Sequence, residues 1–152
     1  SPNSPTSPHL PQANEALSHH HVTVVGAGLA GCEVALQLAA RGVSVTLYEM
    51  KPHKRTPAQH TDLFAELVCS NSFRSDDPNN AIGLLKREMR QLGSQVMDAA
   101  DLHAVPAGSA LAVDRDLFSA ELTRRVHEHP CITVKQEVVE ELPRTKAEGG
   151  ES

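Results

Sequence analysis

Apolar residues in the first third of the chain follow two periods in succession. Val22–Val25 is a β-branched run, which is typical of a buried parallel strand. Ala30, Val34 and Leu38 then recur every fourth residue, as on one side of an α-helix. Gly42 follows at a position where the end of a helix favours a residue that adopts a positive φ. The pattern predicts a strand followed by a helix.

A second strand, expected over residues 43–48, completes a strand–helix–strand unit. Gly26, Gly28 and Gly31 lie between the first strand and the helix in G-x-G-x-x-G spacing. The first glycine permits a tight turn, the second lets a pyrophosphate approach the backbone, and the third lets helix and strand pack closely. Glu49 follows the second strand, 18 residues after Gly31, where it is placed to accept hydrogen bonds from an adenosine ribose.

These parts fall in the order that a dinucleotide-binding unit requires. The helix N-terminus offers free N–H groups and a positive dipole end to phosphates. The residues expected to bind the cofactor are Gly26, Ala27, Gly28, Leu29, Ala30, Gly31 and Glu49. An acid at the end of the second strand favours FAD or NAD over NADP. The alternative is a glycine-rich turn in an ordinary βαβ unit that binds no nucleotide.

Two helical segments are expected in the middle of the chain. Residues 61–67 can form two helical turns with Thr61 as N-cap. A longer helix is expected to begin after Asn80 as N-cap and to run to about Ala100. Its apolar side is expected to carry Leu84, Leu85, Met89, Leu92 and Val96. Its solvated side is expected to carry Lys86, Arg87 and Arg90.

The last third of the chain again alternates between strand and helix patterns. A short strand is expected over residues 110–113, and Asp114 is expected to cap a helix over residues 115–129. The buried stripe of that helix is expected to be Phe118, Leu122 and Val126. Strands are expected over residues 131–135 and 137–142. The alternation predicts an α/β protein with a Rossmann-like FAD/NAD(P)-binding fold.

Composition limits the folded part of the chain and its class. The chain has 152 residues, enough for one domain with a hydrophobic core. Residues 1–20 are expected to form a disordered tail, because four prolines alternate with Ser, Asn and Thr. Residues 144–152 are expected to form a polar tail, which leaves residues 21–143 as the folding part.

Charge and cysteine content exclude several classes of function. The formal net charge of −5 gives no general electrostatic case for binding nucleic acid. The sequence shows neither a membrane span nor a signal peptide, so no membrane association and a cytoplasmic location are expected. Cys32, Cys69 and Cys131 make neither an even disulfide set nor a CxxC pair, so no metal site is expected.

Two polar loops are candidates for contact with a ligand. Lys51, Lys54 and Arg55 form a small basic patch, which is either solvated surface or a contact for cofactor phosphates or an anionic substrate. Residues 68–75 form a polar, turn-prone segment between apolar residues, which predicts a loop pinned against the core. Cys69 in this loop is either a small packed residue or a reactive thiol, depending on its surroundings.

Five motifs give the chain a specific resemblance: GAGLAG (26–31), LYEMKP (47–52), TPAQHTDLFAELVCSNSFRS (56–75), GLLKREMR (83–90) and VPAGSALAVDRDLFS (105–119). With them, residues 22–143 closely resemble the N-terminal part of the TrmFO family of folate- and FAD-dependent tRNA (uracil-5-)-methyltransferases. The resemblance implies that residues 21–143 are the N-terminal part of an FAD-binding domain.

The resemblance also implies a chemistry. The family forms 5-methyluridine in the T-loop of tRNA, with FAD as cofactor and with methylenetetrahydrofolate and NAD(P)H as co-substrates. Its FAD-binding residues map to Gly26–Gly31 and Glu49. The cysteine of its LVCSNS motif, here Cys69, lies near the flavin and is implicated in the reaction, so Cys69 is the expected catalytic residue.

The chain departs from the family in one large respect, because the family's proteins are much longer. The second cysteine of the family, its favoured attacker of uridine, has no match here, and Cys32 and Cys131 are expected to be packing residues. The expectation is therefore an apparently truncated segment that binds FAD weakly or not at all by itself. The alternatives are another FAD- or NAD-dependent oxidoreductase and a non-catalytic nucleotide-binding product.

Overall fold

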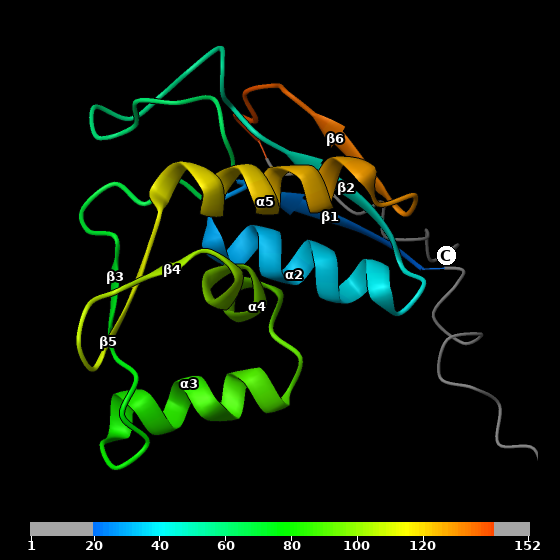
Figure 1. Cartoon of the computed structure of the whole chain (residues 1–152). Helices are drawn as coiled ribbons and strands as arrows, with labels where there is room; N and C mark the ends of the chain where they lie inside the picture. The colour runs from blue at the N-terminus through cyan, green and yellow to red at the C-terminus, as the bar shows by residue number, and fades with distance from the viewer. Residues whose placement is uncertain (1–19, 142–152) are drawn as a thin grey trace, which may run out of the picture.

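The structure is a computed structural model that describes residues 20–141. The expected tails lie outside the described residues, except for His20. The described part contains four helices and two small sheets, which Figure 1 shows with the helices grouped on one side of the parallel sheet. None of its helices is long and apolar enough to cross a membrane.

A parallel sheet carries the predicted strand–helix–strand unit. Its strand order is β1 (His21–Val25), β2 (Ser44–Tyr48) and β6 (Ile132–Lys135). In this register Val45 lies between Val22 and Ile132. The first two predicted strands and the strand expected over residues 131–135 are therefore confirmed.

Helices α2 (Leu29–Ala40) and α5 (Arg115–Glu128) pack on the apolar face of this sheet (Figure 1). The buried stripe predicted for α5 is confirmed, because Phe118, Leu122 and Val126 are completely buried. Asp114 caps α5 as predicted, and its carboxylate accepts a hydrogen bond from the Leu117 N–H at 3.0 Å.

The predicted helix α2 is confirmed, but the side that it buries is not the one that the apolar spacing indicated. Val34 is 46% exposed and Ala30 is also exposed. The buried residues of the helix are Cys32, Ala35, Leu36 and Ala39. Small side chains on the buried side let the helix approach the sheet closely. The fourfold spacing of Ala30, Val34 and Leu38 indicates a different side of the helix. Gly42 has the expected positive φ, +83°.

A second, antiparallel sheet has the strand order β3 (Ser72–Ser75), β5 (Ala110–Val113), β4 (Ala104–Val105). The strand expected over residues 110–113 is confirmed, whereas β4 was not predicted. β3 lies within the segment predicted to be a loop. Residues 137–141 do not form the strand expected there, and Leu142 lies outside the described residues.

The single helix expected from Asn80 to about Ala100 is two helices, α3 (Ala81–Gln91) and α4 (Gln95–Leu102). Asn80 caps α3 as predicted, because its side-chain oxygen accepts the Gly83 N–H at 2.9 Å. Gly93 has a φ of +79° and ends the first helix, and the Ser94 side chain caps the second. An apolar period that continues across the break hid this turn from the sequence pattern.

The helical turns predicted over residues 61–67 are absent, and the segment is an irregular loop. Two of its backbone N–H groups have acceptors that are distant in the chain. The Phe64 N–H donates to Thr123 Oγ1 at 2.9 Å, and the Ala65 N–H donates to the carbonyl oxygen of Ala27 at 2.8 Å. Because tertiary hydrogen bonds replace the local ones of a helix, the helical propensity of the segment is overridden.

Candidate functional site

The loop between β1 and α2 has the geometry that its three glycines predict. Gly26 has a φ of +96°, in the left-handed region that favours glycine, and its N–H donates to the Tyr48 carbonyl oxygen at 2.7 Å. A Cβ built on Gly31 would lie 1.8 Å from the carbonyl oxygen of Gly26. Gly31 therefore lets α2 contact the turn, which is the close helix–strand packing expected of the third glycine.

Gly28 is the N-cap of α2 and leaves space in front of the helix. A Cβ built on Gly28 would have no heavy atom within 4 Å, and no side chain caps this helix end. The first intrahelical bond runs from the Cys32 N–H to the Gly28 carbonyl oxygen at 2.9 Å, so the N–H groups of Leu29, Ala30 and Gly31 precede the helix's own ladder. Free N–H groups, a positive dipole end and open space fit a pyrophosphate.

Glu49 lies at the end of β2 beside the glycine loop. Its side chain is buried, and its two oxygens accept hydrogen bonds from backbone N–H groups, Oε2 from Ala27 at 3.0 Å and Oε1 from Lys51 at 3.2 Å. A carboxylate has about four acceptor positions, so each oxygen keeps a further lone pair. The structure thus brings the predicted ribose acid and the predicted phosphate loop into direct contact.

A third segment, which the sequence did not assign to the site, lies behind the glycine loop. The Ala65 N–H bonds the Ala27 carbonyl oxygen, and Ser119 Oγ donates to the Ala65 carbonyl oxygen at 3.1 Å. Ala65 has a φ of +50°, which a helix would not allow. No sequence pattern marks these contacts, since they join residues from three distant parts of the chain.

The basic patch expected on the loop after β2 is divided by the structure. Lys54 and Arg55 are exposed, as solvated surface requires. Lys51 is only 2% exposed, and its ammonium group bonds the Leu63 carbonyl oxygen and the carboxylate of Glu66. The interpretation of Lys51 as surface is therefore wrong, because the ammonium group has partners that offset its loss of water.

Cys69 is an exposed free thiol. The interpretation of Cys69 as a packed residue is therefore wrong. Near it, the Asn71 side chain donates to the Val113 carbonyl oxygen at 3.1 Å, and the Val113 N–H donates to the Asn71 carbonyl oxygen at 3.0 Å. These bonds attach the loop to the second sheet and leave the Cys69 side chain accessible to a reactant.

The two other cysteines are packing residues, as expected. Cys32 is completely buried in α2, and burial raises the pKa of its thiol to about 12, with a smaller contribution from the charge of Glu49. A thiol with this pKa is protonated at neutral pH and is not a nucleophile. Cys131 is partly buried and packs against the core.

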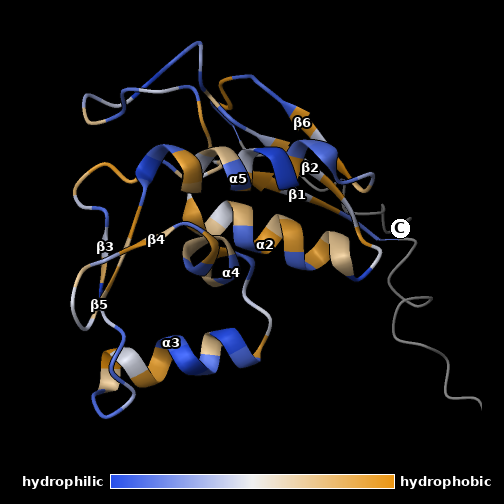
Figure 2. Cartoon of the chain, viewed as in Figure 1, coloured by the Kyte–Doolittle hydropathy of each residue, from blue (hydrophilic) through white to orange (hydrophobic). Residues whose placement is uncertain are grey.

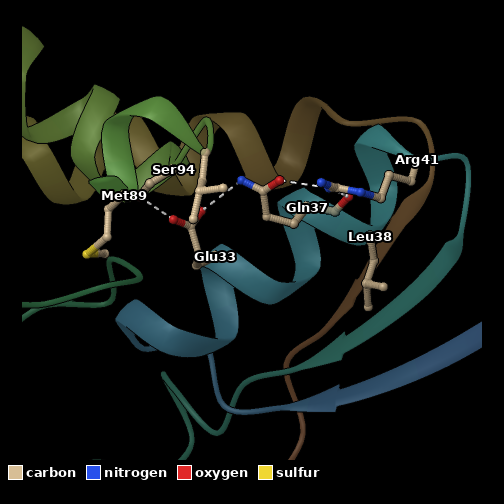
Figure 3. A pocket seen from close by; sticks show the side chains of 7 residues that line it. Glu33, Gln37, Leu38, Arg41, Met89 and Ser94 are labelled. Carbon is tan, nitrogen blue, oxygen red and sulfur yellow. Dashed lines mark hydrogen bonds between the residues drawn. The ribbon is translucent and has the colours of Figure 1, made fainter. Parts of the chain in front are cut away.

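A cavity between α2 and the α3–α4 turn lies away from the glycine loop (Figure 3). Its volume is about 460 Å³. Its polar groups bond to one another: Glu33 accepts from Ser94, Gln37 donates to the Gly93 carbonyl oxygen, and Arg41 donates to Gln37. Since these groups already have partners, this cavity offers less to a polar ligand than the glycine loop does.

Within residues 20–141 no group of His, Cys, Asp and Glu side chains is arranged to hold a metal ion. The glycine loop, the N-terminus of α2 and Glu49 together form the candidate functional site. Its groups are suited to binding phosphates and a ribose, and the exposed Cys69 supplies a thiol elsewhere on the described surface.

The chain is similar to curated proteins named methylenetetrahydrofolate–tRNA-(uracil-5-)-methyltransferase TrmFO. It is 62% identical over 122 residues to the protein of Exiguobacterium sibiricum and 59% identical over 127 residues to that of Bacillus subtilis. These matches cover 80% and 84% of this chain but only 28% and 29% of the relatives. The chain thus spans less than a third of their length and matches their N-terminal part.

Structural comparison agrees on the fold. The structure resembles that of Aquifex aeolicus GidA with a TM-score of 0.59 and 17% sequence identity, over 77% of this chain and 19% of that one. This supports the predicted α/β Rossmann-type class. The sequence model of the family described as glucose inhibited division protein A matches residues 21–150, which is most of the chain. The chain belongs to the glucose inhibited division protein A family.

Proposed function

We propose that this chain supplies the FAD-binding segment of a methylenetetrahydrofolate–tRNA-(uracil-5-)-methyltransferase, which forms 5-methyluridine in the T-loop of tRNA. The observation that carries the cofactor assignment is the open N-terminus of α2 at Gly28, with the carboxylate of Glu49 beside it. The activity assignment rests on the TrmFO relatives, which are 55–62% identical to this chain.

In this proposal each part of the site has one task toward FAD. The N–H groups of Leu29, Ala30 and Gly31 at the open end of α2 face the pyrophosphate, and the backbone of Gly26, Ala27 and Gly28 forms the turn that lets it approach. Glu49 accepts hydrogen bonds from the ribose hydroxyls with its remaining lone pairs. When bound, FAD would supply the redox chemistry of the reaction.

The proposal gives Cys69 the role of the reactive thiol near the flavin, to which its exposure is suited. Methylenetetrahydrofolate and NAD(P)H are the proposed co-substrates of the whole protein, and tRNA is its proposed partner. A cytoplasmic location follows from tRNA as the substrate. The rival assignment, another FAD- or NAD-dependent oxidoreductase, would use the same glycine loop without Cys69.

A chimera tests this proposal. Residues 22–143 of this chain replace the matching N-terminal part of Bacillus subtilis TrmFO, and the chimera is expressed in cells that lack the native enzyme. We expect a protein that retains flavin after desalting and restores 5-methyluridine, measured by mass spectrometry of digested tRNA. Retained flavin without 5-methyluridine would favour the oxidoreductase, and loss of both would contradict the proposal.

Two variants of the chimera separate the two roles. Gly28→Val places a side chain in the open space before α2, so it should abolish flavin retention while the fold is largely kept. Cys69→Ala should keep the flavin but lose methylation by roughly a thousandfold, corresponding to about 4 kcal/mol of barrier. Cys32→Ala and Cys131→Ala are the controls and should retain methylation. If Cys69→Ala methylates within about tenfold of the parent, Cys69 has no chemical role.

A further inference from the structure

A buried ion pair lies behind the candidate functional site. Lys51 and Glu66 face each other with their charged groups 3.3 Å apart, and their side chains are only 2% and 11% exposed. The Lys51 ammonium group also donates to the Leu63 carbonyl oxygen. A buried charge of this kind is costly unless it is paired, so removal of either partner leaves the other unsatisfied.

Glu66 uses its second oxygen to fold the loop that precedes it. Oε1 accepts hydrogen bonds from the His60 N–H at 2.7 Å and from the Thr61 N–H at 3.2 Å. Burial alone would raise the pKa of Glu66, but these N–H groups and Lys51 lower it below its ordinary value, so the carboxylate is ionised at neutral pH. One carboxylate thus joins the start and the end of the loop to Lys51.

The same loop is bonded to the glycine turn, which closes a ring of contacts. The Ala65 N–H donates to the Ala27 carbonyl oxygen at 2.8 Å, and the Ala27 N–H donates to Glu49 Oε2 at 3.0 Å. The other oxygen of Glu49 accepts the N–H of Lys51 at 3.2 Å. The ring therefore runs from Lys51 through Glu66, Ala65, Ala27 and Glu49 back to Lys51.

We propose that the Lys51–Glu66 ion pair is a positioning device that holds the Ala27 turn and the Glu49 carboxylate in the geometry that a nucleotide meets. This inference rests on the proposed function, because it gives the ring a task in nucleotide binding. Lys51 and Glu66 act through Ala65 and Ala27 and do not themselves touch the ligand. Lys51 thus positions the site indirectly, and it is not a surface contact for phosphate.

Backbone amide exchange in the full 152-residue chain tests the ring without any ligand. We expect Lys51→Met and Glu66→Gln to speed exchange at Ala27 and Ala65 by about tenfold more than at Val45, because local opening exceeds global opening when a local link is lost. The Val45 N–H bonds the Cys131 carbonyl oxygen in the parallel sheet, so it reports global unfolding. Lys51→Arg, which keeps the charge, should restore most of the protection.

The matched control is Arg90→Met, which breaks an ion pair with Asp76 and Asp101 far from the glycine loop. It should change exchange at Ala27 and Val45 by the same factor. The double variant Lys51→Met/Glu66→Leu removes both charges, which is often neutral for stability. In the double variant, the amide exchange rate of Val45 should return to that of the parent, while the exchange rate of Ala27 should stay higher than in the parent. If Ala27 follows Val45 in every variant, the pair is merely structural and the proposal is wrong.

ADP binding, measured by titration calorimetry on the same proteins, links the ring to the ligand. We expect ADP to bind the two single variants about tenfold more weakly than the parent. This factor corresponds to loss of one charge-assisted hydrogen bond, the one between the ribose and a displaced Glu49 carboxylate. Equal ADP affinity in variants whose Ala27 exchange is fast would overturn the positioning role. If the parent itself does not bind ADP while Ala27 exchange responds as expected, the ring is supported as a structural link and its task in nucleotide binding fails, whereas the proposed function is decided by flavin retention in the chimera.

Discussion

Two regions of this molecule bury opposite kinds of residue. The parallel-sheet region, made of β1, β2, β6, α2 and α5, has an apolar interior in which Val45, Leu47 and Phe118 are completely buried. In the α3 region, made of β3 and α3, the buried residues of the helix are Gly83 and Lys86. Ile82, Leu84 and Leu85 of the same helix are 41%, 45% and 57% exposed.

The α3 region is organised by close approach and by polar contacts. A Cβ on Gly83 would lie 1.9 Å from the Asp77 carbonyl oxygen, so the helix touches the preceding turn there. Lys86 donates to the Ser75 carbonyl oxygen at 2.6 Å, and burial lowers the pKa of its ammonium group. Figure 2 shows hydrophobic and hydrophilic segments side by side along α3. The difference teaches that hydropathy predicts the buried side of a helix only where apolar packing holds the helix in place. Where polar contacts and close backbone approach hold it, as in α3, hydropathy does not predict that side.

Several apolar side chains of α3 line a groove, although they are partly exposed to solvent. Ile82, Leu85 and Met89 line an apolar groove of about 380 Å³ together with Phe73 and Val96. The groove lies between α3 and the helices α2 and α4, and Leu85 on its wall stays more than half exposed. The apolar side of α3 therefore forms the wall of an open groove and not part of a packed core.

The largest expected effect tests the closest contact of the parallel-sheet region. Gly31→Val would force a side chain into the Gly26 carbonyl oxygen, so we expect the free energy of unfolding to fall by about 5 kcal/mol or more, the range of exceptional mutations. Urea denaturation followed by circular dichroism measures it. Gly28→Ala is the control, and it should unfold within about 1 kcal/mol of the parent because open space surrounds that position.

A pair of truncations compares the two regions directly. Phe118→Ala removes a completely buried ring that packs edge-on against Phe73 at 5.5 Å, so it should cost about 3–5 kcal/mol. Leu85→Ala on α3 should change stability by no more than about 0.5 kcal/mol, as exposed substitutions do. Equal losses of unfolding free energy in the two variants, measured by thermal or urea unfolding, would show that the α3 groove is covered. They would contradict the difference drawn between the two regions.

The buried cation of α3 gives a smaller effect. Lys86→Met removes the desolvation cost of the ammonium group and places an apolar side chain beside the groove, but it leaves the Ser75 carbonyl oxygen without its donor. Because these effects oppose each other, we expect the free energy of unfolding at neutral pH to change by about 1 kcal/mol or less. A loss above about 3 kcal/mol would mean that the polar contact alone holds α3 in place.

An effect confined to acidic pH concerns an ion-pair cluster on α5. Hydrogen bonds from Arg124 and Arg125 lower the pKa of Glu121 from 4.5 to about 2. A lowered pKa in the folded state contributes stability above pH 4.5, and this contribution is lost as the pH falls toward about 2. We expect Glu121→Gln to flatten the acid limb of a stability–pH curve in that window. Parallel curves for parent and variant would exclude a role for this cluster in acid stability.

Much of the fold and part of the site could be predicted from the sequence. The strand–helix–strand unit and the stripe of α5 follow from local periods, and the roles of Gly26 and Gly31 follow from their spacing. The side that α2 buries could not be predicted, because small residues such as Ala35 pack there while Val34 stays exposed. Hydropathy alone does not register close approach of a helix to a sheet.

The contacts behind the site were beyond sequence patterns for a different reason. Lys51, Glu66 and Thr123 acquire their roles through partners that are distant in the chain, such as Thr123 Oγ1 for the Phe64 N–H. A lysine in a proline-containing loop looks like surface, and a short apolar segment looks helical. Only the tertiary arrangement decides both, since backbone groups without local partners take long-range ones.

The register of the parallel sheet has a consequence for the order of folding. β1 and β2 are joined by α2 alone, so their pairing closes a short stretch of chain, whereas β3, α3, α4, β4, β5 and α5 all lie between β2 and β6 in the sequence. Closing the longer stretch costs more chain entropy and slows the step that depends on it. We expect the glycine turn and its acid to be assembled early, with β6 docking last. Substitutions in β6 should then speed unfolding and leave the refolding rate almost unchanged.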